Sequence, residues 1–218
     1  MPDIIGLGSF MIKGSLLAVI VAAIAGWIAV KLVCRRADAI AEVIPDLLVN
    51  GALIVIVFWK FGFVWESPEL IWENPKMLLF MTGSVAELVI GCLLALIYVV
   101  VASYRRGIRL LMLGDVLSVG ILAGVAVLGA WHARNPESLG RAAVAVIVAV
   151  WLLYKKARLG SGKILQDTLL FAGAGWMLST LLFPQQQGAY LLSQLQWVYL
   201  GCVLAGILLP KFASRGEG

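Results

Sequence analysis

Charged residues are scarce in this sequence. They make up 13% of the chain, whereas hydrophobic residues make up 62%, and the mean hydropathy is +1.00. Soluble globular domains carry about 25% charged residues, so this composition excludes that class. The net charge of +5 comes without the clustered basic and aromatic residues of a nucleic-acid-binding surface. The composition predicts an integral membrane protein that binds no nucleic acid.

Residues that bind metals or carry out redox chemistry are also few. Cys34, Cys92 and Cys202 are widely separated and form no C-x-x-C pair or metal-ligand spacing. The single histidine, His132, follows a long apolar stretch. A lone histidine at a membrane interface is more often a surface residue than a ligand. We therefore predict no metal site and no cofactor.

Long apolar runs dominate the sequence. A helix of about 20 residues crosses the roughly 30 Å hydrocarbon core, and backbone exposed to lipid must be helical or part of a closed barrel. The runs lack the alternation of barrel strands. They lie at about residues 15–34, 44–64, 77–103, 108–131, 141–155, 164–183 and 189–210. The sequence predicts an all-α, polytopic bundle of seven spans that forms a single transmembrane domain, residues 1–218.

The distribution of basic residues predicts the orientation of these spans. Twelve of the seventeen lysines and arginines fall on one side of a seven-span path. These are Lys31, Arg35, Arg36, Arg105, Arg106, Arg109, Lys155, Lys156, Arg158, Lys163, Lys211 and Arg215. By the positive-inside rule, this side is cytoplasmic. The N-terminus is then outside and the C-terminus is inside.

Two ionisable residues fall in the outer halves of predicted spans. Lys60 lies about four residues from the outer end of the second span and Glu87 about ten residues from the outer end of the third, or roughly 6 and 15 Å deep. A short loop joins these spans, so we expect antiparallel neighbours in which the amine can meet the carboxylate. Charges at this depth cost a few kcal/mol and mark candidate functional sites. Snorkelling to the headgroups is the alternative for Lys60, whereas Glu87 is paired, protonated or faces a cavity.

Three further carboxylates have structural interpretations. Asp46 and Asp167 lie near the basic ends of their spans, where ion pairs with neighbouring lysines or arginines explain them. Asp115 lies deeper in the fourth span. We expect it to accept hydrogen bonds from a neighbouring helix or to pair with Arg109.

Several segments, in this order, resemble the prolipoprotein diacylglyceryl transferases. Residues 7–14 (LGSFMIKG) are similar to the family's outer I-G-P-x-x-I-R-W-Y-G segment, without its Trp and Tyr. Residues 34–37 (CRRA) are similar to its basic end of span 1, and residues 60–64 (KFGFV) to its R-x-G-Y-V. A loop rich in tryptophan and proline follows, as in the family. The resemblance implies seven spans with the N-terminus outside.

The resemblance continues along the chain while the family's reactive residues are lost. Residues 86–91 (AELVIG) match H-G-G-L-I-G without the histidine, and residues 126–130 (AVLGA) stand in place of G-R-L-G-N. Residues 173–176 (GAGW) replace the late G-x-x-R, residues 180–183 (TLLF) replace its E-F-x-R continuation, and Gln194 alone matches the family's G-Q. The family's essential arginines are therefore absent at both positions.

The resemblance implies a set of site residues. Lys60, Gly62, Trp176 and Gln194 are the expected lipid-binding residues. If any chemistry persists, Lys60 is the candidate anchor for a phosphate and Glu87 the candidate acid or base. Valine and tryptophan at the arginine positions can supply neither positive charge nor a base.

The preferred interpretation is a multi-pass protein of the bacterial cytoplasmic membrane, without the family's transfer chemistry. It binds a phospholipid, with phosphatidylglycerol a candidate, or a lipid-bearing membrane protein partner in a cavity of the outer leaflet. One alternative is an active phosphatidylglycerol-dependent diacylglyceryl transferase with Lys60 and Glu87 as a rearranged site. Another is a small transporter or a subunit of a membrane complex, although no inverted repeat or pair of broken helices is evident.

Overall fold

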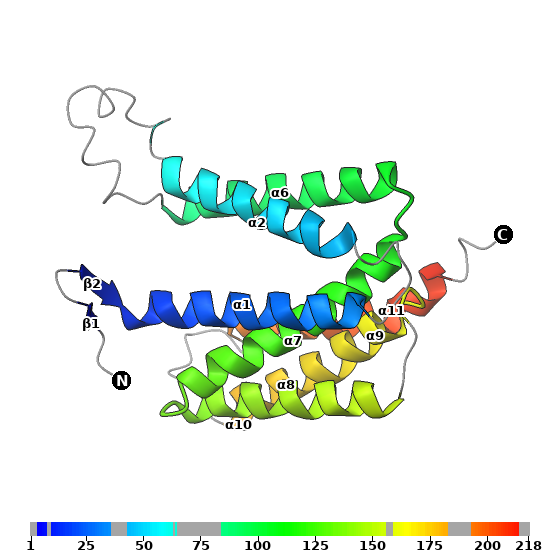
Figure 1. The fold of residues 1–218 in the computed structure, drawn as a ribbon. Coiled ribbons are helices and arrows are strands. Elements are labelled where there is room, and N and C mark those ends of the chain that lie inside the picture. The colour runs from blue at the N-terminus through cyan, green and yellow to red at the C-terminus, as the bar shows by residue number, and fades with distance from the viewer. Residues whose placement is uncertain are drawn as a thin grey trace. The chain divides into compact units, whose positions relative to one another are not determined.

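The computed structural model describes residues 4–7, 10–35, 43–62, 64, 84–155, 159–182 and 193–213. Helices correspond to all seven predicted stretches (Figure 1). They are α1 (Gly14–Cys34), α2 (Val43–Phe61), α6 (Val85–Arg105), α7 (Leu110–Trp131), α8 (Pro136–Lys155), the consecutive segments α9 (Lys163–Asp167), η2 (Thr168–Ala172) and α10 (Gly173–Leu182), and α11 (Gln194–Ala213). The predicted helical architecture is confirmed. The N-terminal segment departs from it, because β1 (Ile4–Leu7) and β2 (Phe10–Lys13) form an antiparallel hairpin.

Five of the described helices are long and apolar enough to cross a membrane, namely α1, α2, α6, α7 and α8. Their large apolar side chains are often exposed, as at Ile97 (58%), Ile147 (66%) and Leu153 (68%). Surfaces of this kind are rare on soluble monomers and suit a hydrocarbon environment. The chain is a multi-pass integral membrane protein.

The chain divides into two compact units. One comprises Met1–Ala37 with Leu111–Gly218, and the other comprises Asp38–Leu110. The single domain predicted over residues 1–218 stays a prediction.

The smaller unit is a helical hairpin of α2 and α6. Gly51 packs beside Val99, and Gly91 packs against Val55, so that residues early in one helix meet residues late in the other. The side-chain amide of Asn50 donates a hydrogen bond to the Tyr98 hydroxyl at 3.2 Å. These contacts confirm the expected antiparallel pairing of the second and third apolar stretches.

The larger unit packs α1, α7, α8, α11 and the continuous helix of residues 163–182. At the contact of α1 with α7, a Cβ atom on Gly26 would lie 2.8 Å from the Gly120 carbonyl oxygen, so only glycine permits this approach. The core lies between α7, α8 and the helix of residues 163–182. It contains Leu122, Ala145, Val148, Leu152, Ile164 and Ala172.

Asp115 of α7 is fully buried and caps the start of the helix that begins at Lys163. Its carboxylate accepts hydrogen bonds from the backbone N–H groups of Gly160 at 2.9 Å, Gly162 at 3.0 Å and Leu165 at 2.8 Å. Gly162 is the N-cap residue and makes no side-chain cap of its own. Asp115 therefore satisfies amide groups that every helix start leaves unpaired, and it does so from a neighbouring helix.

Two glycines shape the turn that meets Asp115. Gly160 and Gly162 have φ angles of 84° and 71°, in the left-handed region that other residues enter at a cost of about 1 kcal/mol or more. Of the two expectations for Asp115, hydrogen bonding to a neighbouring segment is confirmed. The expected ion pairing of Asp167 is also confirmed, because Lys155 Nζ lies 2.9 Å from its carboxylate.

Replacing Asp115 by asparagine should destabilise the larger unit by about 2–4 kcal/mol, because the amide keeps one acceptor oxygen and turns an N–H group toward backbone donors. Thermal unfolding in detergent measures the effect. Ser118→Ala is the matched control, since the Ser118 hydroxyl only donates to the Gly114 carbonyl of its own helix. Equal losses in the two variants would contradict the capping role.

Candidate functional site

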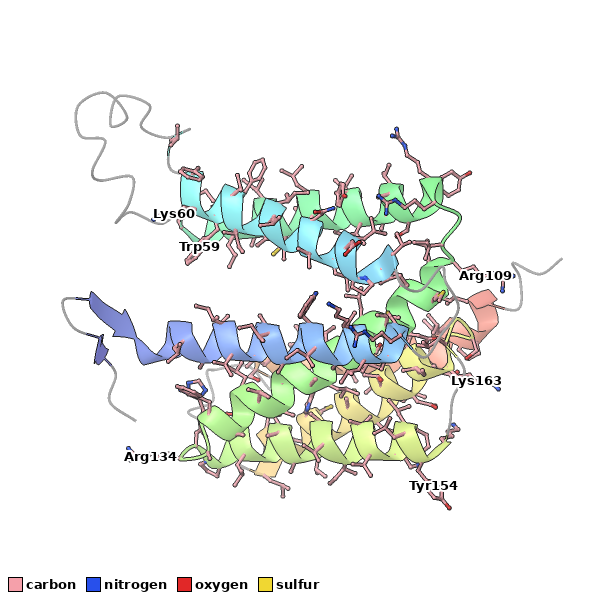
Figure 2. All side chains as sticks on the ribbon, in the orientation of Figure 1. Trp59, Lys60, Arg109, Arg134, Tyr154 and Lys163 are labelled. Carbon is pink, nitrogen blue, oxygen red and sulfur yellow. The ribbon has the colours of Figure 1, made fainter. Side chains whose placement is uncertain are left out.

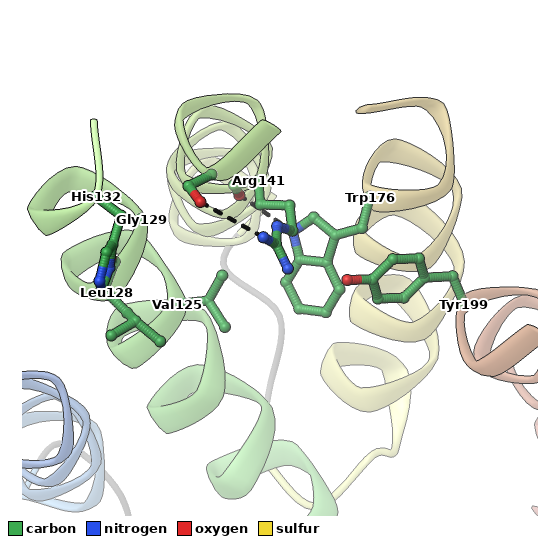
Figure 3. A pocket seen from close by; sticks show the side chains of 8 residues that line it. Val125, Leu128, Gly129, His132, Arg141, Trp176 and Tyr199 are labelled. Carbon is green, nitrogen blue, oxygen red and sulfur yellow. Dashed lines mark hydrogen bonds between the residues drawn. The ribbon is translucent and has the colours of Figure 1, made fainter. Parts of the chain in front are cut away.

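A cavity of about 360 Å³ lies in the larger unit between α7, α8, α10 and α11 (Figure 3). Its walls are mainly apolar and aromatic, with a few polar groups, which is the usual character of small-molecule sites. The lining residues are Val125, Leu128, Gly129, His132, Ser138, Arg141, Trp176 and Tyr199. The cavity is near the C-terminus of α7 and the N-terminus of α8, the end predicted to face the outside.

Arg141 supplies the one guanidinium of the lining. Its Nη2 atom lies 3.6 Å from Glu137 Oε1 and 3.5 Å from the Ser138 hydroxyl oxygen. Both contacts are long and both use the same nitrogen. A guanidinium has five N–H donors in a planar fork, so Arg141 is held in place and still has donors for an anionic ligand.

The start of α8 places Arg141 inside the helix. Asn135 accepts a hydrogen bond from the Glu137 N–H at 3.1 Å, and Pro136 occupies the first helical position. Both are common signals of a helix start. The predicted fifth span begins at residue 141, which put Arg141 at its edge. The helix begins five residues earlier, so Arg141 is its sixth residue, and it lines the cavity.

Trp176 connects α10 to α8 at the cavity wall. Its indole N–H donates to the Arg141 carbonyl oxygen at 3.1 Å. Its ring lies 5.8 Å from the ring of Tyr199, tilted by 56°, and Figure 3 shows Trp176 between Arg141 and Tyr199. The indole N–H is therefore committed to the backbone, and Trp176 offers a ligand its apolar face.

His132 lies at the end of α7 and lines the cavity. Its ring nitrogen Nδ1 is 3.0 Å from the Leu128 carbonyl oxygen. The residue is exposed, as the sequence predicts for a surface histidine, and it also lines the cavity. Among the described residues, no group of three or more His, Cys, Asp or Glu residues is placed to hold a metal ion.

Three of the predicted site residues lie in the hairpin unit. Lys60 is in the last turn of α2 (Figure 2). A Cβ atom on Gly62 would lie 2.2 Å from Glu87 Cγ, so Gly62 packs directly on the Glu87 side chain. This contact brings the end of α2 against the start of α6. The roles of Lys60, Gly62 and Glu87 stay predictions.

The helix that carries Glu87, α6, begins at Val85, whereas the predicted span begins at about residue 77. Glu87 is therefore the third residue of α6, in its first turn, and its depth in the membrane stays a prediction. Ser84 is the N-cap, its hydroxyl accepts from the Ala86 N–H at 3.2 Å, and it donates to the Glu87 carboxylate. The spacing S-x-x-E is that of a capping box. Helix capping therefore accounts for this carboxylate.

At the start of α11, Ser193 and Gln196 make two reciprocal capping bonds. The Ser193 N–H donates to Gln196 Oε1 at 2.8 Å, and the Gln196 N–H donates to the Ser193 hydroxyl at 3.3 Å. The Gln196 amide also donates to the Thr180 hydroxyl of α10 at 3.3 Å. Ser193 and Gln196 therefore form an uncharged capping box, and Gln196 also joins α11 to α10.

The predicted lipid-binding residues are divided between the two units. Trp176 lines the cavity of the larger unit, whereas Lys60 and Gly62 belong to the hairpin unit. The side chain of Gln194 lies outside the described residues. Sequence reasoning missed Arg141 and Tyr199 as lining residues, although Asn135 and Pro136 gave a signal for the earlier start of α8.

Comparison with known proteins identifies no relative, since neither a family model nor a curated protein matches this chain. The chemistry of the cavity must therefore be inferred from its own residues. It combines an apolar and aromatic wall with a guanidinium, an imidazole and two hydroxyl groups. This combination can bind an amphiphile that carries a small anionic group.

Proposed function

We propose that this protein binds a phospholipid in the cavity between α7, α8, α10 and α11, with Arg141 on the phosphate. The protein would be a divergent member of the prolipoprotein diacylglyceryl transferase family in the bacterial cytoplasmic membrane. Phosphatidylglycerol is the candidate ligand, taken from the outer leaflet. The observation that carries the proposal is the Arg141 guanidinium, held beside Trp176 in a mainly apolar and aromatic cavity.

The surroundings of the cavity also support a lipid. The helices that contribute Trp176 and Tyr199 expose large apolar side chains elsewhere, among them Leu178 (56%) and Leu182 (64%) of α10 and Val198 (58%) of α11. A headgroup in the cavity would leave its acyl chains in the hydrocarbon beside these helices. A water-soluble phosphate would gain nothing from such a surface.

The charges of Arg141 and Glu137 favour binding of the lipid without transfer of its diacylglyceryl group. A departing phosphate needs concentrated positive charge, and an incoming thiol needs a base. Glu137 lies 3.6 Å from Arg141 and offsets part of its charge. The side chain of Arg141 is thus suited to hold a phosphodiester, and it is a weak stabiliser of the additional charge on a leaving group.

Phosphatidylglycerol adducts of the purified protein should fall about ten-fold or more in Arg141→Gln, because a charge-assisted hydrogen bond to phosphate contributes roughly 1.5–3 kcal/mol. Native mass spectrometry counts the adducts. Arg134→Gln is the matched control, since Arg134 is exposed and directed away from its turn (Figure 2). Equal losses in both variants, or displacement of the lipid by equimolar glycerol 3-phosphate, would contradict a lipid site at Arg141.

Purified protein mixed with phosphatidylglycerol and a lipobox peptide bearing a cysteine should form no diacylglyceryl peptide. The assay detects the mass gain of the peptide. Turnover that disappears in Lys60→Ala and Glu87→Gln would refute the proposal in favour of the rearranged-site transferase. A protein that co-purifies in equal amount, with no lipid adduct, would instead favour a subunit of a membrane complex.

The proposed orientation places the N-terminus outside, seven spans in the membrane and the C-terminus in the cytoplasm. Alkaline phosphatase is active only after export, so its fusion after Ala133 should be active and its fusion after Ala213 inactive. Both fusion proteins must be detected by immunoblot for the comparison to count. Activity in the reverse pattern would invert the topology and move the cavity to the inner leaflet.

A further inference from the structure

We propose that His132 selects the headgroup, so that the site prefers phospholipids whose headgroup ends in a hydrogen-bond donor. This inference rests on the proposed function of the cavity and adds a specificity to it. The favoured class contains headgroups ending in a hydroxyl or a protonated amine. The disfavoured class contains choline, whose quaternary ammonium has no N–H or O–H group.

A hydrogen bond at the end of α7 fixes the tautomer of His132. The Leu128 carbonyl oxygen can only accept a hydrogen bond, so the ring nitrogen Nδ1, at 3.0 Å, must be the donor. A neutral imidazole carries one proton, and the other nitrogen is then an acceptor. In the neutral ring, Nε2 is therefore the acceptor, and it is the nitrogen that remains for a ligand.

Arg141 and Trp176, which also line the cavity, supply hydrogen-bond donors. The Arg141 guanidinium has donors only, and its Nη2 atom is shared between Glu137 and Ser138 at 3.6 and 3.5 Å. The indole N–H of Trp176 is committed to the Arg141 carbonyl. A phosphodiester, which only accepts, suits Arg141 and offers nothing to Nε2 of His132.

A ligand that satisfies both His132 and Arg141 needs an acceptor and a donor in the same headgroup. His132 and Arg141 come from α7 and α8 and line the same cavity of about 360 Å³ (Figure 3). Since both residues line this cavity, a headgroup bound there would have its phosphate on Arg141 and its terminal hydroxyl or ammonium group on Nε2. Phosphatidylglycerol and phosphatidylethanolamine meet this requirement, and phosphatidylcholine does not.

The test is competition between lipids with identical acyl chains, present in equal amounts in micelles of the full chain, with adducts counted by native mass spectrometry. Phosphatidylglycerol and phosphatidylethanolamine adducts should each exceed phosphatidylcholine adducts about five-fold, the equivalent of one hydrogen bond. The preference should disappear in His132→Phe, which has no acceptor. It should persist in His132→Gln, whose amide oxygen accepts.

A second measurement needs no variant and so does not depend on how His132→Phe folds. Phosphatidylethanolamine is compared with its N-methyl and N,N-dimethyl derivatives and with phosphatidylcholine. All but the last keep an N–H donor, so the expected adduct ratio changes chiefly at the third methylation. An even decline with each methyl group would indicate that headgroup size is selected, and would overturn the inference.

The remaining outcomes separate this inference from the proposed function. Lipid adducts that depend on Arg141 but show equal amounts of the three headgroups would overturn the selection by His132 and leave the lipid site in place. A preference that survives in His132→Phe would do the same. Absence of lipid adducts in the wild-type protein would overturn both.

Discussion

The carboxylate of Asp115 is the interaction on which the larger unit depends. A buried carboxylate costs several kcal/mol unless its oxygens are paired, and here three backbone N–H groups between residues 160 and 165 donate to it. The same bonds satisfy the start of a helix whose N-cap residue, Gly162, has no side chain to cap it. These bonds therefore pair both the buried carboxylate and the backbone N–H groups of the helix start. They also fix the start of the helix that carries Trp176 relative to α7.

A second constraint acts along that helix. Between Thr168 and Ala172 the chain forms a π-helical segment, which changes the angular position of every later residue relative to a regular α-helix. The segment lies between Asp115-capped α9 and α10, so the direction of Trp176 follows from the cap and the π-helical segment together. The π-helical segment is packed on both sides. Ala172 lies in the core, and Leu170 packs against Gly206 of α11.

The sequence predicted the helices well because a membrane span is specified by composition and length, which are local properties. It also predicted that Asp115 would accept hydrogen bonds and that Asp167 would be ion-paired, since a carboxylate in an apolar run must find a partner. It did not predict the Asp115-capped turn, because the donors lie about 45 residues further along the chain. It began the third span before the start of α6, because apolar residues precede Ser84 in the sequence.

The cavity was missed for a different reason. In the sequence, Arg141 is one of the few basic residues on the side predicted to face the outside, and nothing else distinguishes it. The structure places it within α8, which begins at Pro136, directly after Asn135. A cavity is a property of several helices, and none of its lining residues is unusual alone.

The residues that matter for the proposed function share one feature, which is that each has part of its hydrogen-bonding capacity already used within the protein. The Trp176 N–H is bound to Arg141, His132 Nδ1 to Leu128, and Arg141 Nη2 is shared by Glu137 and Ser138. Groups held in this way lose little freedom when a ligand binds, so they favour selective binding at a fixed geometry.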